Sequence, residues 1–220
     1  ALGVDAYRDE LGLLPEAVSN YLLRLGWGHG DDEIISREQA IEWFDLDHVG
    51  KSPSRFDFKK LENLNGHYMR EADDGRLADL VAPKLALAQD QKQLLVRAMP
   101  ELKARAHTLN ELADGARFLF ASRPIDVDEA AAALLTADAR ERLHRSHGRL
   151  AALAEWDSGS LEAAIREVAE ASGAKLGKLA QPLRAALTGH TTAPGIFDVL
   201  ALLGREESLY RIADQMEPKE

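Results

Sequence analysis

The segment Lys175-Leu-Gly-Lys-Leu-Ala-Gln-Pro-Leu-Arg-Ala-Ala-Leu-Thr-Gly189 says more about the fold than any other stretch of this chain. It predicts a helix around residues 182–187, and Thr192-Ala-Pro-Gly195 predicts the turn that follows it. The rest of the sequence has the same helical character, because Leu, Ala, Glu and Arg are abundant and β-branched residues are sparse. No segment reads as a convincing strand. We therefore predict an all-α fold built from two to three consecutive helical bundles.

Apolar periodicity and capping signals predict the other helices. Val18, Tyr21, Leu22 and Leu25 recur at spacings of three and four, which places them on one face of a helix over residues 14–26. Two Ser/Thr-x-x-Gln/Glu patterns predict capping boxes, at residues 36–39 and 108–111. Pro83 and Pro100 are expected to set or bend helix boundaries. Further helices are predicted at residues 56–69, 128–135, 136–156, 161–171 with Ser160 as the cap, 197–203 and 206–216.

Length and composition limit the classes of protein that the chain can belong to. Its 220 residues can bury one large core or two to three small ones. The absence of cysteine excludes disulfides and thiolate zinc sites and fits a cytoplasmic protein. No apolar run is long enough to span a membrane, and no signal peptide is recognisable. Because the sequence lacks a starting Met, we expect the chain to begin inside a longer protein.

The charge distribution suggests a local site for an anion. The formal net charge is −10, yet Ala171 to Phe197 contains no Asp or Glu. Lys175, Lys178 and Arg184 carry the charge of this acid-free segment, and RNA is the first candidate for its ligand. From charge alone, a solvated helix followed by a Pro-Gly turn is the simpler interpretation. The same holds for two further cationic stretches, at residues 51–70 and at residues 92–107, which include Lys103 and Arg105.

No pattern in the sequence predicts a catalytic or metal-binding site. His144 and His147 have a spacing that can bind metal, but four arginines surround them and would repel a cation: Arg140, Arg142, Arg145 and Arg149. The residues Asp45, Asp47 and His48 predict a turn. Gly26-Trp-Gly-His-Gly30 follows a predicted helix, not a strand, and therefore is not a dinucleotide-binding fingerprint. Trp27, Trp43 and Trp156 are interpreted as core or interface anchors.

Three segments together resemble the C-terminal half of the bacterial glutamyl-tRNA synthetases, a family of class I aminoacyl-tRNA synthetases. The first is Leu14-Pro-Glu-Ala-Val-Ser-Asn-Tyr-Leu-Leu-Arg-Leu-Gly-Trp27. The second is Phe56-Asp-Phe-Lys-Lys-Leu-Glu-Asn-Leu-Asn-Gly-His-Tyr68. The third is the Lys175–Gly189 segment together with Ala193-Pro-Gly195. They occur in the family's order and at its separations, so the resemblance covers nearly the whole chain.

The resemblance implies a modular layout. Residues 1–70 would belong to the fold that contacts the inner tRNA stem, and residues 71–156 and 157–220 would form two anticodon-binding helical subdomains. The partners implied are tRNA(Glu) and the chain's own N-terminal catalytic Rossmann domain, and we expect a monomer. The family's His-Ile-Gly-His and Lys-Met-Ser-Lys-Ser signatures are missing from this sequence. ATP and Mg²⁺ would therefore serve the full-length enzyme, with no cofactor bound by this chain.

The resemblance also assigns residues to the anticodon. Arg105 aligns with the arginine that reads the third base, where cytosine offers acceptors to a guanidinium and guanine presents donors. Arg184 and Ile196 align with residues at the first base, and Ala193 and Pro194 with residues at the second. The family pattern has Thr where this chain has Ala193. Lys103, Lys175 and Lys178 are expected to support binding. The alternative is a helical protein-interaction module without RNA binding.

Overall fold

The computed structural model describes residues 3–51 and 53–217, and helices are its sole regular secondary structure over these ranges. The all-α prediction is thereby confirmed. The chain divides into two compact units, Ala1–Gly115 and Ala116–Glu220. The three-part division into residues 1–70, 71–156 and 157–220 concerns contacts with tRNA and stays a prediction. No helix of the described residues is both long and apolar enough to cross a bilayer.

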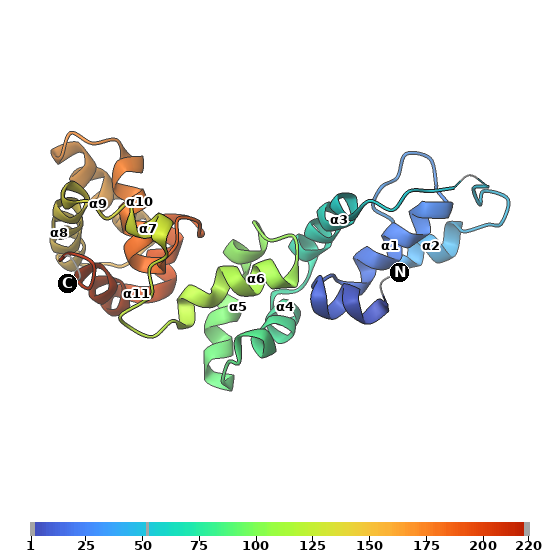
Figure 1. Ribbon diagram of the computed structural model, residues 1–220, viewed down its shortest axis with the longest axis horizontal. Helices are drawn as coiled ribbons and strands as arrows, with labels where there is room; N and C mark the ends of the chain where they lie inside the picture. Colours follow the sequence, from blue (N-terminus) through green and yellow to red (C-terminus); the bar gives the residue numbers. More distant parts are fainter. Residues whose placement is uncertain (1–2, 52, 218–220) are drawn as a thin grey trace. The chain divides into compact units, whose positions relative to one another are not determined.

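Over its described residues, the first unit contains six α-helices and two short helices of other types. They are η1 (Ala6–Glu10), α1 (Pro15–Gly26), α2 (Arg37–Trp43), α3 (Phe58–Glu71), α4 (Asp74–Val81), η2 (Ala82–Leu85), α5 (Gln89–Lys103) and α6 (Leu109–Ala116), whose last residue belongs to the second unit (Figure 1). Helix α3 packs against both α1 and α5, and α4 packs against α5. The α1–α3 contact buries Leu13, Tyr21 and Leu61 in one cluster. Helix α3 therefore links the start of the unit to α5.

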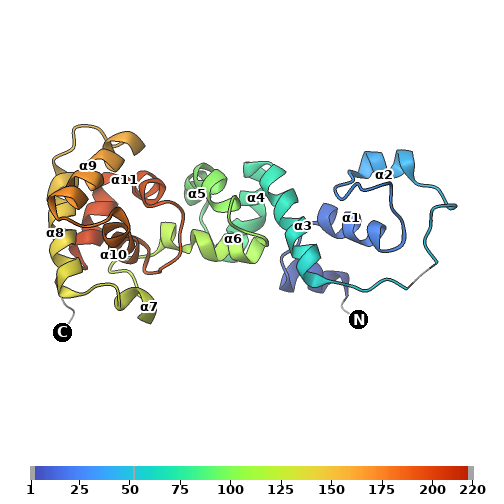
Figure 2. The ribbon, with the colours of Figure 1, turned by 90° about the horizontal axis from the view of Figure 1, so that it is seen from above.

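The second unit is a bundle of four longer helices with two short ones before it. Its elements are η3 (Arg117–Phe120), α7 (Glu129–Ala132), α8 (Ala137–Ala151), α9 (Ser158–Ala171), α10 (Leu176–Thr188) and α11 (Ile196–Ala213). Helices α8, α9, α10 and α11 all pack against one another, as Figure 2 shows from above. Their apolar faces bury Leu143, Ile165, Leu183 and Val199. The apolar stripes supply the core, so the polar faces of these helices are left for solvent or a ligand.

Several helix ends differ from the prediction. Asp157, not Ser160, caps α9: one carboxylate oxygen accepts from the Ser160 N–H and the other from its hydroxyl, each at 2.9 Å. The helix predicted over residues 136–156 ends at Ala151, and the carbonyl oxygens of Leu153 and Ala154 beyond it accept from the Arg205 guanidinium instead of from a helix. Helix α7 is likewise shorter than the predicted 128–135. Pro100 lies inside α5 and does not mark its boundary.

Helix α11 breaks where two helices were predicted. Gly204 has φ 77° and ψ 171°, so the backbone leaves the helical conformation at this one residue. The Leu200 carbonyl oxygen accepts from the Trp156 indole N–H at 2.9 Å and from the Ser208 hydroxyl at 3.4 Å. Residues 196–203 and 205–213 are therefore two helical segments on either side of a glycine.

Candidate nucleic-acid interface

The acid-free segment folds into α10 and the turn after it. Helix α10 begins six residues before Pro182, and its N-cap residue Lys175 makes no side-chain capping bond. The side chains of Lys175 and Lys178 are both exposed in this first turn. Unsatisfied N–H groups at a helix start carry a partial positive charge, which the two ammonium groups reinforce. The start of α10 therefore has the electrostatics of an anion-binding surface.

The turn that follows α10 is held rigidly by its own side chains and by the segment before α7. The Thr188 hydroxyl donates to the Arg184 carbonyl oxygen at 2.8 Å and accepts from the His190 N–H at 3.2 Å. The Asp128 N–H donates to the Gly189 carbonyl oxygen at 2.9 Å. Gly189 has φ 77°, and a Cβ there would lie 2.0 Å from the Asp126 carbonyl oxygen. Only glycine fits both the conformation and the space.

A hydrogen bond between the His190 ring and the Asp128 carboxylate closes this turn and was not predicted from the sequence. His190 Nδ1 lies 2.8 Å from Asp128 Oδ2, while Asp128 Oδ1 accepts from the Ala131 N–H at 2.7 Å and caps α7. The hydrogen bonds from His190 and from the Ala131 N–H hold the pKa of Asp128 below its usual value. The two residues are 62 positions apart, so no local pattern could have joined them.

The structure places the six candidates of the second unit on one continuous stretch of chain. Arg184 lies on α10 and is half-buried, and Ala193 is half-buried in the turn. Pro194 is buried, and Ile196 is buried as the first residue of α11, with 5 % of its surface exposed. Lys175 and Lys178 stand at the opposite end of α10. This stretch therefore combines exposed cations at one end of α10 with a hydrogen-bonded turn at the other.

The other two candidates lie in the first unit, where their surroundings differ. Arg105 is exposed just after α5, in the turn that leads to α6. The Lys103 ammonium donates to the Ala72 carbonyl oxygen at 2.8 Å and lies 2.8 Å from Asp74 Oδ1. Its side chain is 17 % exposed. We therefore expect Lys103 to support the α4–α5 packing more than any ligand.

A groove of about 380 Å³ runs between α1, α3 and the loop after α1. Its lining includes the cationic side chains of Arg24, Arg55 and Lys60, and Arg24 lies 3.6 Å from Glu33. Arg55 and Lys60 belong to the cationic stretch that the sequence marked at residues 51–70. Arg24 lies on α1, outside that stretch, and the fold brings it to the same groove. We refer to this feature as the α1–α3 groove.

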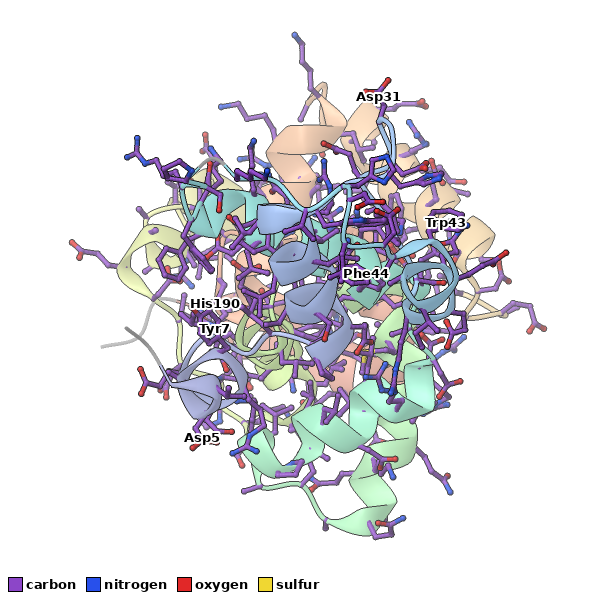
Figure 3. All side chains as sticks on the ribbon, turned by 90° about the vertical axis from the view of Figure 1, so that its right-hand side faces the viewer. Asp5, Tyr7, Asp31, Trp43, Phe44 and His190 are labelled. Carbon is purple, nitrogen blue, oxygen red and sulfur yellow. The ribbon has the colours of Figure 1, made fainter. Side chains whose placement is uncertain are left out.

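Two of the tryptophans predicted to be anchors, and the turn predicted at Asp45, lie in the first unit. Trp27 is buried, and Trp43 stacks on the ring of His29 with the centroids 4.2 Å apart. Figure 3 shows Trp43 and Phe44 at the end of α2, and Asp31 on the loop before it. Asp45 accepts from the N–H and the ring of His48, which confirms the turn there. Within residues 3–51 and 53–217, no three His, Asp or Glu side chains gather as metal ligands.

Comparison with known proteins identifies similar sequences over the whole chain. Residues 76–216 match a family model described as "Anticodon binding domain", and residues 3–63 match "tRNA synthetases class I (E and Q), catalytic domain". A glutamate–tRNA ligase 2 of Rhizorhabdus wittichii is 67 % identical over 98 % of this chain and 47 % of its own length. One of Novosphingobium aromaticivorans is 66 % identical over 98 % of this chain and 45 % of its own length.

The fold is also found in a solved structure. A glutamate tRNA ligase from Elizabethkingia meningosepticum, crystallised in complex with its amino acid, superposes with a TM-score of 0.82 at 26 % identity. The superposition covers 96 % of this chain and 42 % of that protein. The chain thus spans about half the length of the relatives that it matches.

Proposed function

Because the chain belongs to the anticodon-binding-domain family and is homologous to the C-terminal half of glutamate–tRNA ligases, we propose that it recognises the anticodon of tRNA(Glu). The observation that carries this proposal is the acid-free segment 171–197. It forms one helix with exposed lysines at its start and one rigid turn at its end, in a chain with net charge −10. A helical protein-interaction module without RNA binding is not favoured, because the relatives are tRNA ligases.

Arg105 is proposed to read the third anticodon base. A guanidinium donates five N–H groups and accepts none, so it can pair with N3 and O2 of an unpaired cytosine. Guanine presents N–H donors on that edge, and two facing donors would remain unsatisfied. A bidentate contact of this kind favours the matching base over a mismatched one by roughly 1–3 kcal/mol of binding free energy. Glutamate and glutamine tRNAs differ at this base, C against G, so Arg105 would favour the glutamate tRNA.

The stretch from Arg184 to Ile196 is proposed to bind the other two bases, with Arg184 and Ile196 at the first and Ala193 and Pro194 at the second. Arg184 supplies a cation, and because Pro194 is buried, its contact is assigned to the main chain of the turn. Since the Ile196 side chain is buried, we assign its contact to the main chain at the start of α11, where N–H groups have no helical partner. Lys175 and Lys178 would bind phosphates.

The first unit is proposed to contact the tRNA stem through the α1–α3 groove. Arg24, Arg55 and Lys60 can neutralise phosphates there, a contact that fixes orientation without reading sequence. Residues 1–70 would form this stem-contact part, and residues 71–156 and 157–220 the two anticodon-binding subdomains. Each part would then bind one region of a single tRNA.

The full-length protein is proposed to attach glutamate to tRNA(Glu) with ATP and Mg²⁺, as a cytoplasmic monomer. The ATP-binding signatures of the family are missing from this chain. ATP chemistry would belong to the N-terminal Rossmann domain that the resemblance implies. This chain would contribute recognition and orientation, and it should be silent in ATP–pyrophosphate exchange.

Filter binding with paired anticodon stem-loops tests the proposal. The two RNAs differ only at the third anticodon base, C or G. The chain should prefer C, and its affinity for both RNAs should fall as salt rises, because phosphate contacts release counterions. Arg105→Gln should reduce the preference for C and leave the salt dependence nearly unchanged. An equal affinity for both RNAs would remove Arg105 from the reading site, and no binding at low salt would refute RNA recognition altogether.

A further inference from the structure

The turn that carries Arg105 is short and tightly bounded by buried residues. Leu102 at the end of α5 is 4 % exposed and Ala106 is 5 % exposed, whereas the Arg105 side chain between them faces outward. The Arg105 N–H donates to the Leu102 carbonyl oxygen at 3.3 Å. Buried neighbours therefore fix one side of this turn. The direction of the guanidinium depends on how firmly the other side is held.

The peptide groups of His107, two residues after Arg105, are held from two directions. The His107 carbonyl oxygen accepts from Asn65 Nδ2 on α3 at 2.6 Å. The His107 N–H donates to Glu111 Oε2 on α6 at 2.7 Å. The predicted capping box at residues 108–111 is therefore shifted at one end. The Thr108 hydroxyl accepts from the Glu111 N–H as expected, but Glu111 binds the N–H of His107 and not that of Thr108.

Of the two residues that hold His107, Asn65 is buried and Glu111 is exposed. The Asn65 side chain is fully buried, at 0 % exposure, and its Oδ1 accepts from the Leu14 N–H at 2.7 Å. One amide thus joins the start of α1, the middle of α3 and the turn after α5. A buried side-chain amide with both ends satisfied has one orientation available, because turning it over would face donor to donor and acceptor to acceptor.

We propose that Asn65 and Glu111 are positioning residues that aim Arg105 at the third anticodon base. Together they fix the His107 peptide and so restrict the backbone from which the guanidinium extends. Paired hydrogen bonds to one base edge need both N–H groups in line, since hydrogen bonds weaken steeply as their angle closes. A looser turn would still present a positive charge to RNA but would distinguish the bases less well. This inference rests on the proposed role of Arg105.

The first test removes the buried amide. Asn65→Leu keeps the number and branching of the side-chain heavy atoms and deletes the donor to His107, and Asn20→Leu is its matched control. Asn20 is a second buried amide of the same unit, at 3 % exposure, and its Oδ1 accepts from the Ile35 N–H and the Tyr68 hydroxyl. Neither partner belongs to the Arg105 turn. Both changes lower stability, so binding is measured at a temperature where circular dichroism shows both variants folded.

The second test uses an exposed residue whose replacement leaves the core intact. Glu111→Ala deletes the acceptor for the His107 N–H, while Glu111→Gln removes the same charge and keeps an oxygen acceptor. Both variants gain equally in general affinity for RNA, because both lose one negative charge. Only Glu111→Ala should lose discrimination between the bases. This pair therefore separates positioning from electrostatics.

The measured quantity is the ratio of dissociation constants for the G and C stem-loops at one salt concentration. The unchanged chain should give a ratio of roughly 5- to 150-fold. Asn65→Leu and Glu111→Ala should each lower it by about 2- to 12-fold, the effect of one hydrogen bond. Asn20→Leu and Glu111→Gln should leave it unchanged. These outcomes would support positioning.

Two results would overturn the inference, and they are distinguishable. If Arg105→Gln abolishes the preference but both Asn65→Leu and Glu111→Ala retain it, the positioning role is wrong while the role of Arg105 stands. If Arg105→Gln leaves the ratio unchanged, the reading role of Arg105 fails and the positioning role fails with it. If Asn20→Leu lowers the ratio as much as Asn65→Leu does, the effect of both changes is one of general stability. The comparison of Glu111→Ala with Glu111→Gln then decides whether the His107 contact positions Arg105.

Discussion

The guanidinium of Arg211 donates to the carbonyl oxygen of Phe118 at 2.7 Å, across 93 positions of sequence. Arg211 is 1 % exposed, and it also donates to the carbonyl oxygens of Leu187 and Ala121 and to Glu207. One buried cation thus joins α11 to the end of α10 and to the segment around η3. Because Leu187 immediately precedes Thr188, this contact also supports the turn that we assign to the anticodon.

Replacing Arg211 should strongly destabilise the second unit. Arg211→Met removes the donor to the buried carbonyl oxygens of Phe118 and Leu187 and breaks the ion pair with Glu207, at an expected cost of about 3–5 kcal/mol in the free energy of unfolding. Arg166→Met is the control, since Arg166 pairs only with Glu162 on an exposed face of α9. That change should cost no more than about 0.5 kcal/mol. Urea unfolding measures the loss of unfolding free energy in both variants. Equal losses would contradict the role of Arg211 in holding α10, α11 and the segment around η3 together.

Gly189 and Gly30 test whether the turn after α10 needs glycine for space or for conformation. Both have positive φ, 77° and 54°, but a Cβ at Gly30 would meet no atom within 4 Å. Gly30→Ala should therefore cost about 1 kcal/mol, from backbone strain alone. Gly189→Ala should cost several times more, because the methyl group meets the main chain at Asp126, and it should weaken RNA binding. Similar unfolding midpoints for the two variants would show that the turn can open.

The ion pair between Glu16 and Arg76 should give the first unit a pH-dependent stability. The Arg76 guanidinium binds both carboxylate oxygens, at 2.6 and 3.0 Å. Burial raises the pKa of Glu16, but the hydrogen bonds from Arg76 and from the main chain, with the charge of Arg76, outweigh it, so the pKa lies below its usual value. A carboxyl with a lowered folded-state pKa stabilises the fold above its unfolded pKa, about 4.3, and loses this contribution as pH falls through the folded value.

The measurement compares the unchanged chain with Glu16→Gln across pH. The unchanged chain should be more stable by about 0.5–1 kcal/mol at neutral pH, and the difference should remain level down to about pH 5. It should then shrink toward zero below about pH 4. A difference that grows as the solution becomes more acidic has the wrong sign and would contradict the assignment.

Ala193 offers a gain-of-function test at the second anticodon base. Ala193→Thr introduces the hydroxyl that the family pattern carries, whereas Ala193→Val adds the same bulk without a donor or acceptor. Both residues suit the extended conformation favoured before Pro194. Thr should improve discrimination at the second base by about 0.5–1.5 kcal/mol, and Val should not. Competition binding with stem-loops altered at that base measures the effect, and equal behaviour of Thr and Val would place position 193 away from it.

Local signals in the sequence predicted local structure well. The capping box at Ser36 is present as predicted: its hydroxyl accepts from the Gln39 N–H at 3.1 Å, and Gln39 Oε1 accepts from the Ser36 N–H at 2.9 Å. All of its atoms lie within four residues. The cap of α9 was misassigned because Asp157 and Ser160 are both good caps, and only the fold shows that the carboxylate binds the serine.

Contacts between distant residues decided what the sequence could not predict. The acid-free segment supplies the exposed lysines at the start of α10, but the turn that we propose to bind RNA is closed by the contact between His190 and Asp128. The turn that carries Arg105 is held by Asn65, 42 residues before His107. Nothing in the composition of either segment points to its partner. For Lys103 the sequence pattern predicted a contact with a ligand. In the structure its ammonium group instead contacts the Ala72 carbonyl oxygen and the Asp74 carboxylate.

The break in α11 limits which amino acids can occupy position 204, because the backbone there has a positive φ. Gly204 occupies a backbone conformation that is the mirror image of an extended one, open to achiral glycine and closed to natural amino acids. The surrounding space is empty, so the obstacle is stereochemical and not one of bulk. A D-alanine introduced by chemical ligation should therefore fit where L-alanine does not, and it should stiffen the junction between the two halves of the helix.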